Sequence, residues 1–187
     1  RFGPDTVLTG HSMGATIAAL AGAERTFGKV VLIDGGLPLP VPPDMAPDKA
    51  VDVNFGASIE RLGRTFPSVG EYVDFFLSHP VFAGWRTEGS EEYARYDALE
   101  TTQGVRSRVR EEAVRQNGHW LVTGAAPIAA ALEKVTSPLT LVRASHGRQN
   151  EPGGMLPEAA AQHWQRRLPG LRDELIEDSN HYSILFK

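Results

Sequence analysis

Five consecutive residues near the start of the chain, Gly10–Gly14 (Gly-His-Ser-Met-Gly), constrain its fold more than any other segment. The apolar run Thr6–Thr9 precedes them and a stretch of small residues that begins at Ala15 follows them. This order predicts a strand, an abrupt turn and a helix, with Ser12 in the turn. Glycines on both sides of such a turn let neighbouring backbone pass without a Cβ clash. The segment therefore predicts a serine presented at the carboxyl edge of a parallel sheet.

The predicted position of Ser12 also has a chemical meaning. A serine at a helix N-terminus lies beside free amides and the positive end of the helix dipole, which favour the negative charge that develops when a carbonyl is attacked. We therefore predict that Ser12 is a nucleophile. The alternative is a serine with a purely structural role in the turn.

Composition limits the classes of function that fit the chain. Its 187 residues suit one domain, or one core with an inserted subdomain, and its net charge of −4 gives no reason to expect a nucleic-acid partner. The chain has no cysteine, which excludes disulfides, thiol catalysis and cysteine-ligated metals. No apolar stretch approaches the ~20 residues of a membrane span, and no signal peptide is visible, so a cytoplasmic location is expected. The oligomeric state is left open.

Four short apolar runs predict parallel strands covered on both faces, and they bracket a segment of different character. The runs are Thr6–Thr9, Lys29–Ile33, Pro138–Arg143 and Asp173–Ile176. Helices are expected at Ala15–Phe27 and Pro157–Leu168, which makes βαβ units. We predict a sheet-containing core at 1–40, a helical lid at 41–122 and a return to the core at 123–187.

The lid is predicted to be helical throughout, without a clear strand. Its expected helices are Ala57–Phe66, Val69–Ser78, Glu91–Leu99 and Val105–Gln116, and Pro127–Val135 leads back to the sheet. Aromatic residues gather in this segment. Most are expected to pack its own helices, but a lid also presents apolar surface to a pocket, which favours a hydrophobic small-molecule substrate.

The strand that carries Ser12 begins close to the first residue. A doubly wound sheet places other strands on both sides of such a strand, because a bare apolar edge strand is prone to aggregation. We therefore expect the sequence to be the C-terminal part of a longer polypeptide, with further N-terminal strands.

A serine nucleophile needs a base, and His181 is the best of the six histidines. It follows the last predicted strand in the segment Ser-Asn-His-Tyr, at the sheet edge that presents Ser12. His11 adjoins the nucleophile, but the turn is expected to direct it elsewhere, into a packing role. The histidines show no metal-ligand spacing, so we expect no metal and no cofactor.

The carboxylate that would orient His181 has two candidates. Asp34 directly follows the strand Lys29–Ile33, at the same sheet edge as Ser12, and two glycines after it allow a sharp bend. Glu151 lies in the loop after the strand Pro138–Arg143. Asp34 is favoured, and Glu151 remains the alternative acid.

The order Ser12, Asp34, His181 and the Gly-His-Ser-Met-Gly segment resemble the α/β-hydrolase superfamily. The resemblance implies a mostly parallel sheet with flanking helices and a helical lid. In that superfamily the acid most often follows the strand where this chain offers Glu151. Thioesterases that release polyketide and peptide chains carry it one strand earlier, as Val30–Asp34 does. The resemblance also makes the Met13 amide one donor of an oxyanion hole, whose second donor would come from an earlier loop.

These features together predict a serine hydrolase that cleaves an ester or thioester through an acyl-enzyme, active when the expected N-terminal part is present. The triad would be Ser12, His181 and Asp34. A carbon–carbon bond hydrolase or a perhydrolase would use the same residues. A non-catalytic ligand-binding relative is the alternative from a different class.

Overall fold

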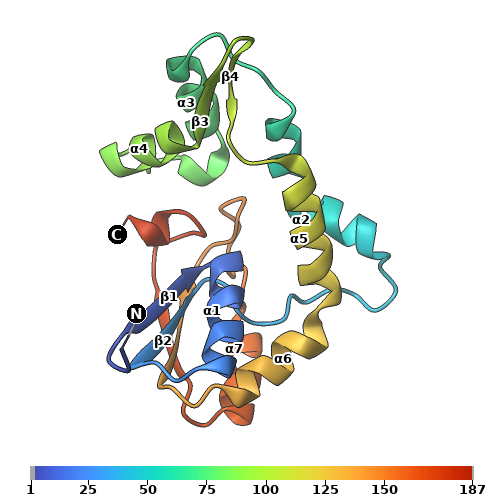
Figure 1. Ribbon diagram of the computed structural model, residues 1–187, viewed down its shortest axis with the longest axis vertical. Helices are drawn as coiled ribbons and strands as arrows, with labels where there is room; N and C mark the ends of the chain where they lie inside the picture. The colour runs from blue at the N-terminus through green and yellow to red at the C-terminus, as the bar shows by residue number, and fades with distance from the viewer. Residues whose placement is uncertain (1–2, 187) are drawn as a thin grey trace. The chain divides into compact units, whose positions relative to one another are not determined.

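The structure, a computed structural model, describes residues 3–186 (Figure 1). The chain divides into two compact units. The first contains the chain up to Pro38 and the segment Gly124–Leu185. The second contains Leu39–Thr123 together with Phe186.

A four-stranded parallel sheet in the order β1-β2-β5-β6 forms the centre of the first unit. Its strands are β1 (Val7–His11), β2 (Lys29–Ile33), β5 (Leu139–Ala144) and β6 (Arg172–Ile176). All four predicted strands are present, with ends that differ from the prediction by no more than two residues. Because the strands are parallel, their carboxyl ends meet at one edge of the sheet.

Three helices cover one face of this sheet: α1 (Met13–Glu24), α6 (Ala125–Lys134) and α7 (Glu158–Arg167). Gly22 of α1 lies against Val30, and the β5 side chain Arg143 reaches Glu158 at the start of α7. The strand register places Val30 and Arg143 on the same side of the sheet. Successive right-handed crossovers in one direction produce this arrangement.

The two faces of the sheet differ in burial. On the helix-covered face, Leu32 and Leu141 are fully buried. On the opposite face, Val31 and Val142 are half-buried and Val7 of the edge strand is 55% exposed. Parallel sheets are ordinarily covered on both faces. In the described residues, however, the second face of this sheet is partly open.

The second unit contains four helices, one short 3-10 helix and a β-hairpin. The helices α2 and α5 pack on each other around Ala50, Val51, Ile59 and Val122. The elements are α2 (Pro47–Leu62), α3 (Val69–Leu77), η1 (Pro80–Phe82), α4 (Glu88–Asp97), β3 (Ala98–Thr101), β4 (Gly104–Ser107) and α5 (Glu111–Thr123).

The prediction that this segment lacks strands is wrong. An antiparallel hairpin pairs β3 with β4, and the helix predicted at 105–116 begins instead at Glu111. Gly104 has φ +118°, a conformation that L side chains rarely adopt, and this allows the tight connection. The charged residues in both strands made the segment resemble a helix, and tertiary pairing overrides that local preference.

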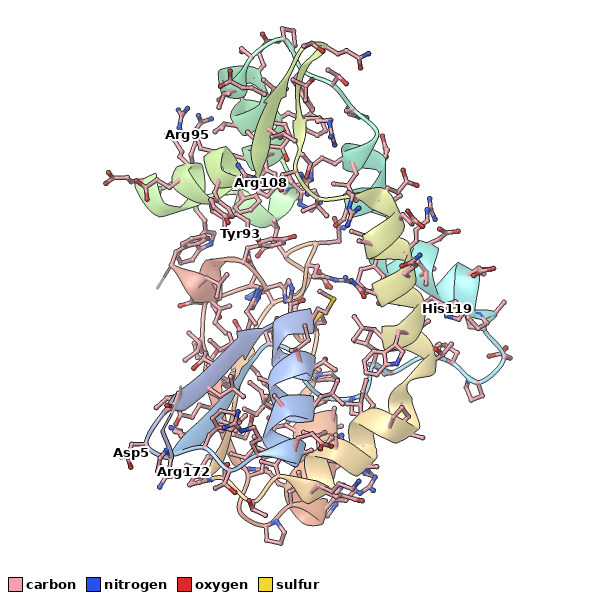
Figure 2. All side chains as sticks on the ribbon, in the orientation of Figure 1. Asp5, Tyr93, Arg95, Arg108, His119 and Arg172 are labelled. Carbon is pink, nitrogen blue, oxygen red and sulfur yellow. The ribbon has the colours of Figure 1, made fainter. Side chains whose placement is uncertain are left out.

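A buried polar cluster joins four elements of the second unit. The Asp97 carboxylate at the end of α4 accepts hydrogen bonds from Arg61 of α2 (2.6 Å), Tyr72 of α3 and Ser107 of β4 (2.9 and 3.0 Å). Burial and the bond to Asp97 raise the pKa of Tyr72, so its hydroxyl stays protonated. At the surface of the same unit, the Arg108 guanidinium lies over the Tyr96 ring. Figure 2 labels Arg108 among the side chains of this unit.

Within residues 3–186, no helix is both long and apolar enough to cross a lipid bilayer.

Candidate active site

The predicted turn at Ser12 is present between β1 and α1. Ser12 has φ 55° and ψ −122°, which is strained for a residue with a side chain. Its N–H donates to the Ile33 carbonyl (2.9 Å), so the turn is tied to the end of β2. A Cβ on Gly10 would lie 2.0 Å from the Gly14 carbonyl oxygen, and a Cβ on Gly35 would lie 2.3 Å from that of Ser12. Both close approaches require glycine.

Asp34 follows β2 directly and is fully buried, at 0% exposure. Its N–H donates to the Val142 carbonyl at 2.8 Å, which continues the pairing of β2 with β5. One carboxylate oxygen, Oδ1, accepts from the Ala144 N–H at 3.2 Å. The other, Oδ2, accepts from Nδ1 of His181 at 2.7 Å. The carboxylate is thus fixed by the strand beside it.

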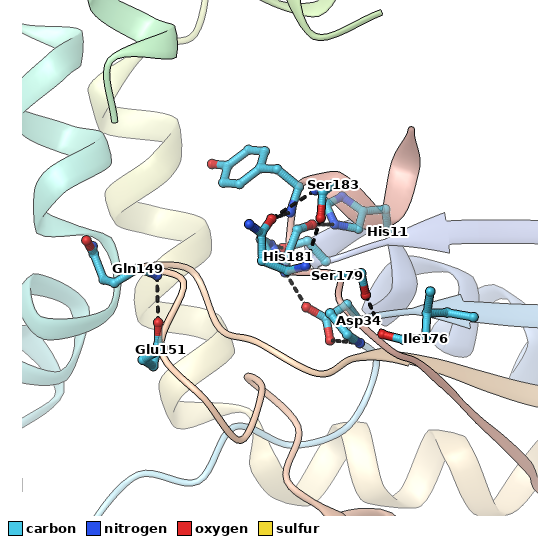
Figure 3. Close-up of polar contacts among 12 residues, drawn as sticks. His11, Asp34, Gln149, Glu151, Ile176, Ser179, His181 and Ser183 are labelled. Carbon is cyan, nitrogen blue, oxygen red and sulfur yellow. Dashed lines mark hydrogen bonds and ion pairs between the residues drawn. The ribbon is translucent and has the colours of Figure 1, made fainter. Parts of the chain in front are cut away.

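His181 links Asp34 to Ser12 through the two nitrogens of its ring. Figure 3 shows the bond between Asp34 and His181. With Nδ1–H donating to Asp34, Nε2 carries a lone pair and accepts from the Ser12 hydroxyl at 3.0 Å. The structure therefore brings together the three residues that the sequence predicted. They come from the ends of β1 and β2 and from the loop after β6.

Asn180 shapes the loop that carries His181, a contribution that the sequence analysis missed. Its Oδ1 accepts from the backbone N–H groups of Tyr182 (3.1 Å) and Ser183 (2.9 Å), and its own N–H donates to the Ser183 hydroxyl (2.8 Å). Its amide nitrogen also donates to Oδ1 of Asn150 (3.0 Å). An asparagine beside a predicted base is a signal for such a turn, because its short amide bonds to backbone two and three residues on.

A second set of bonds joins the His181 loop to the loop after β5. The His146 N–H donates to the Ser179 carbonyl at 2.8 Å. The Ser145 hydroxyl donates to the same carbonyl at 3.2 Å and accepts from the Ser179 N–H at 3.3 Å. His181 is therefore held on a loop that is bonded to the sheet edge.

The alternative acid, Glu151, is bonded within its own turn. Its Oε2 accepts from the Gln149 N–H at 2.7 Å, and its carbonyl accepts from the Gly147 N–H at 2.8 Å. Figure 3 shows this contact apart from the bond between Asp34 and His181. The carboxylate bonded to His181 is that of Asp34.

Met13, the expected oxyanion donor, is the first residue of α1. Backbone N–H groups in the first turn of a helix lack an intrahelical acceptor. The Met13 side chain is 40% exposed. The helix N-terminus adds a partial positive charge beside Ser12. In the described part of the chain, no group of three His, Asp or Glu residues is arranged to hold a metal ion.

The site thus has a strained serine between a strand and a helix. The serine is bonded to a histidine, and the histidine is bonded to a buried carboxylate. This arrangement can be compared with known protein families. The model of the alpha/beta hydrolase family matches residues 1–186. The chain belongs to this family. No curated protein sequence matches this alpha/beta hydrolase.

Solved structures have the same fold as this alpha/beta hydrolase. E-2-(acetamidomethylene)succinate hydrolase superposes with a TM-score of 0.72 at 19% identity, over 96% of this chain and 61% of that one. A peroxisomal alpha-beta-hydrolase from Saccharomyces cerevisiae gives 0.69 at 17% identity, over 96% and 49%. A thioesterase domain from the curacin biosynthetic pathway gives 0.67 at 18% identity, over 96% and 60%. The chain thus spans about half to three fifths of the length of these structures.

His11 contacts His181 in this alpha/beta hydrolase. Its Nε2–H donates to the His181 carbonyl at 2.8 Å, and the two ring centroids lie 4.5 Å apart. Burial, followed by the proximity of His181, lowers the pKa of His11 to about 4. The neutral ring is therefore its dominant form near pH 7. The sequence analysis expected packing here and did not anticipate a contact with His181.

Proposed function

We propose that this alpha/beta hydrolase is a serine hydrolase that cleaves a carboxylic ester or thioester through an acyl-enzyme. The observation that supports the proposal is the unbroken chain from the Ser12 hydroxyl through His181 to the buried Asp34. A hydroxyl bonded to a neutral imidazole, which is bonded in turn to a carboxylate, is the arrangement that makes serine nucleophilic.

In the proposed reaction, Oγ of Ser12 attacks the carbonyl carbon while its proton passes to Nε2 of His181. Asp34 stabilises the imidazolium that forms, and the Met13 N–H with the start of α1 stabilises the oxyanion. The carbon–oxygen or carbon–sulfur bond then breaks, and His181 gives the proton to the departing alcohol or thiol. Water, deprotonated by His181, attacks acyl-Ser12. The bond from the acyl carbon to Oγ of Ser12 then breaks, Oγ takes the proton back from His181, and the carboxylic acid leaves.

The structural neighbours are consistent with an acyl substrate. They include the thioesterase domain described above, a marine microorganism esterase and an enol-lactonase from Burkholderia xenovorans. We assign substrate choice to the segment 41–122, the proposed lid, and expect a hydrophobic acyl group. Carbon–carbon cleavage, perhydrolysis and ligand binding without turnover are the alternatives.

Labelling with a fluorophosphonate probe tests the proposal, because the probe reacts with serines that a base activates. We expect the full chain to be labelled at Ser12, as mapped by peptide mass spectrometry, and to hydrolyse p-nitrophenyl butyrate and an acyl thioester. Ser12→Ala should abolish both. A wild-type chain that stays unlabelled while folded would overturn the proposal and favour a non-catalytic ligand-binding protein.

A further inference from the structure

We propose that His11 is a positioning residue for His181, which it holds by its main chain in register with Ser12. The inference rests on the proposed function, because it assigns a role at the same site. Its basis is the bond from His11 Nε2 to the His181 carbonyl (2.8 Å), together with the packing of the two rings.

This bond holds a part of His181 that its other contacts leave free. Asp34 and Ser12 bind the two ring nitrogens, and these bonds fix the ring relative to its partners. The carbonyl of His181 is fixed by His11, from the adjacent strand end. With its ring and its main chain both held, the imidazole has little freedom to turn away from Ser12.

Because of its position in the chain, His11 connects the turn that carries Ser12 to the loop that carries His181. His11 precedes Ser12 directly, so the peptide between them, the Ser12–His181 bond and the His181–His11 bond form a closed ring of contacts. A shift of the turn therefore moves Ser12 and His11 together. The closed ring thereby limits how far Ser12 Oγ and His181 Nε2 can separate.

The chemistry of His11 suits a neighbour that becomes charged. An imidazolium forms on His181 during the proposed reaction, and a permanent cation 4.5 Å from it would oppose that charge. His11 donates a hydrogen bond while neutral, and its lowered pKa keeps it so at neutral pH. Lysine or arginine at this position would donate as well, but with a charge of the wrong sign.

Two substitutions separate the hydrogen bond from the space that the ring fills. His11→Leu removes the donor, and His11→Gln places an amide N–H near the position of Nε2. For His11→Leu we expect the kcat for p-nitrophenyl butyrate and the rate of Ser12 labelling to fall roughly 10- to 100-fold, with KM nearly unchanged. His11→Gln should recover most of the loss. His163→Leu, at an exposed histidine of α7, is the matched control and should behave as wild type.

The inference is overturned if folded His11→Leu is labelled at the wild-type rate, or if folded His11→Gln is as slow as His11→Leu. Should His11→Leu not fold, the wild-type protein still decides the matter through the long-range ¹H–¹⁵N NMR spectrum of its histidines. We expect His11 as the neutral Nε2–H tautomer at neutral pH, and an Nδ1–H tautomer would refute the bond. A wild-type chain without reactive Ser12 would remove the proposed function and this inference together.

Discussion

At the scale of single residues, the position of one carboxylate determines how the site is assembled. Asp34 lies one residue beyond β2, where a positive φ of 41° turns it out of the strand. That turn lets the side chain accept from both Ala144 and His181. Asp34 is therefore a part of the sheet edge rather than of a mobile loop.

The two candidate acids give opposite expectations in kinetics. Asp34→Asn should lower kcat by several orders of magnitude, about 10⁴-fold in the triad template, because an amide stabilises the wrong tautomer of His181 and no imidazolium. Glu151→Gln should leave kcat within the experimental error, since Glu151 bonds to Gln149 and not to His181. Steady-state hydrolysis of p-nitrophenyl butyrate checks both variants. Loss of kcat in Glu151→Gln alone would assign the acid to Glu151.

The buried cation Arg143 predicts a large effect on stability. Its side chain is 3% exposed and donates to Asp173 (two bonds of 2.7 Å), to Glu158 (2.6 Å) and to the Leu156 carbonyl (3.0 Å). Arg143→Met leaves the largely buried Asp173 without its partner. We expect a loss of about 3–5 kcal/mol in the free energy of unfolding, measured by urea denaturation. Arg166→Met, at an exposed position of α7, is the control and should change little.

The lowered pKa of His11 predicts a loss of stability in acid. The unfolded chain binds a proton at His11 below pH 6.5, whereas the folded chain binds one only near pH 4. The free energy of unfolding should therefore fall as pH drops from about 6.5 to 4, by up to about 3 kcal/mol from this group. Denaturation at a series of pH values tests this. His11→Gln should show a shallower pH dependence over the same range.

At the scale of elements, the two glycines of the Gly10–Gly14 segment are not equivalent. A Cβ on Gly10 would meet the start of α1 at 2.0 Å, whereas a Cβ on Gly14 meets nothing within 4 Å. Gly10→Ala should therefore displace the turn, abolish Ser12 labelling and destabilise the fold by about 1–3 kcal/mol. Gly14→Ala should fold normally and gain about 0.5–1 kcal/mol, because alanine favours a helix. Labelling and thermal melting of the two variants test the contrast, and equal behaviour would contradict it.

The strands of the first unit were predictable because each is a continuous run of apolar, often β-branched residues, as in Lys29–Ile33. The hairpin of the second unit was not. Its strands Ala98–Thr101 and Gly104–Ser107 are short and carry Glu100 and Arg106, so neither the period nor the composition distinguishes them from a helix. Pairing with each other, a non-local property, is what makes them strands.

The candidate site shows the same division between local and non-local information. Ser12, Asp34 and His181 each follow a recognisable strand, so their meeting at one sheet edge could be inferred from order alone. The contacts of His11 with His181 and of Asn180 with Asn150 depend on loop geometry that no spacing reveals. The choice between Asp34 and Glu151 likewise depended on where the β5–α7 loop runs.

At the scale of the whole molecule, pairing in the sheet predicts a gradient of stability. β2 and β5 have a strand on each side, whereas β1 and β6 have one partner among the described residues. Native-state hydrogen exchange should be slowest at the amides of β2 and β5 and faster in the two-stranded hairpin β3–β4. Faster exchange in β2 than in the hairpin would contradict this order.

The sequence does not predict the substrate, and the packing of the aromatic residues in the second unit shows why. Its aromatic rings pack largely on one another, as do Phe66 with Tyr72 (5.2 Å between centroids) and Phe76 with Phe82 (5.3 Å). Counting aromatic residues therefore says little about an acyl-binding surface. Profiling with esters and thioesters of graded acyl length is the direct route to the substrate class.

The Ser12 turn also has a place in the order of folding. Its N–H bonds to the last residue of β2, and its carbonyl packs against Gly35, so β1 and α1 cannot complete the turn by themselves. We therefore expect the strained serine conformation to form after this non-local contact, and later than the local helices. In a refolding experiment, reactivity toward a fluorophosphonate should lag behind the recovery of the helical circular dichroism signal. The reactivity of Ser12 would thus report when the last steps of folding are complete.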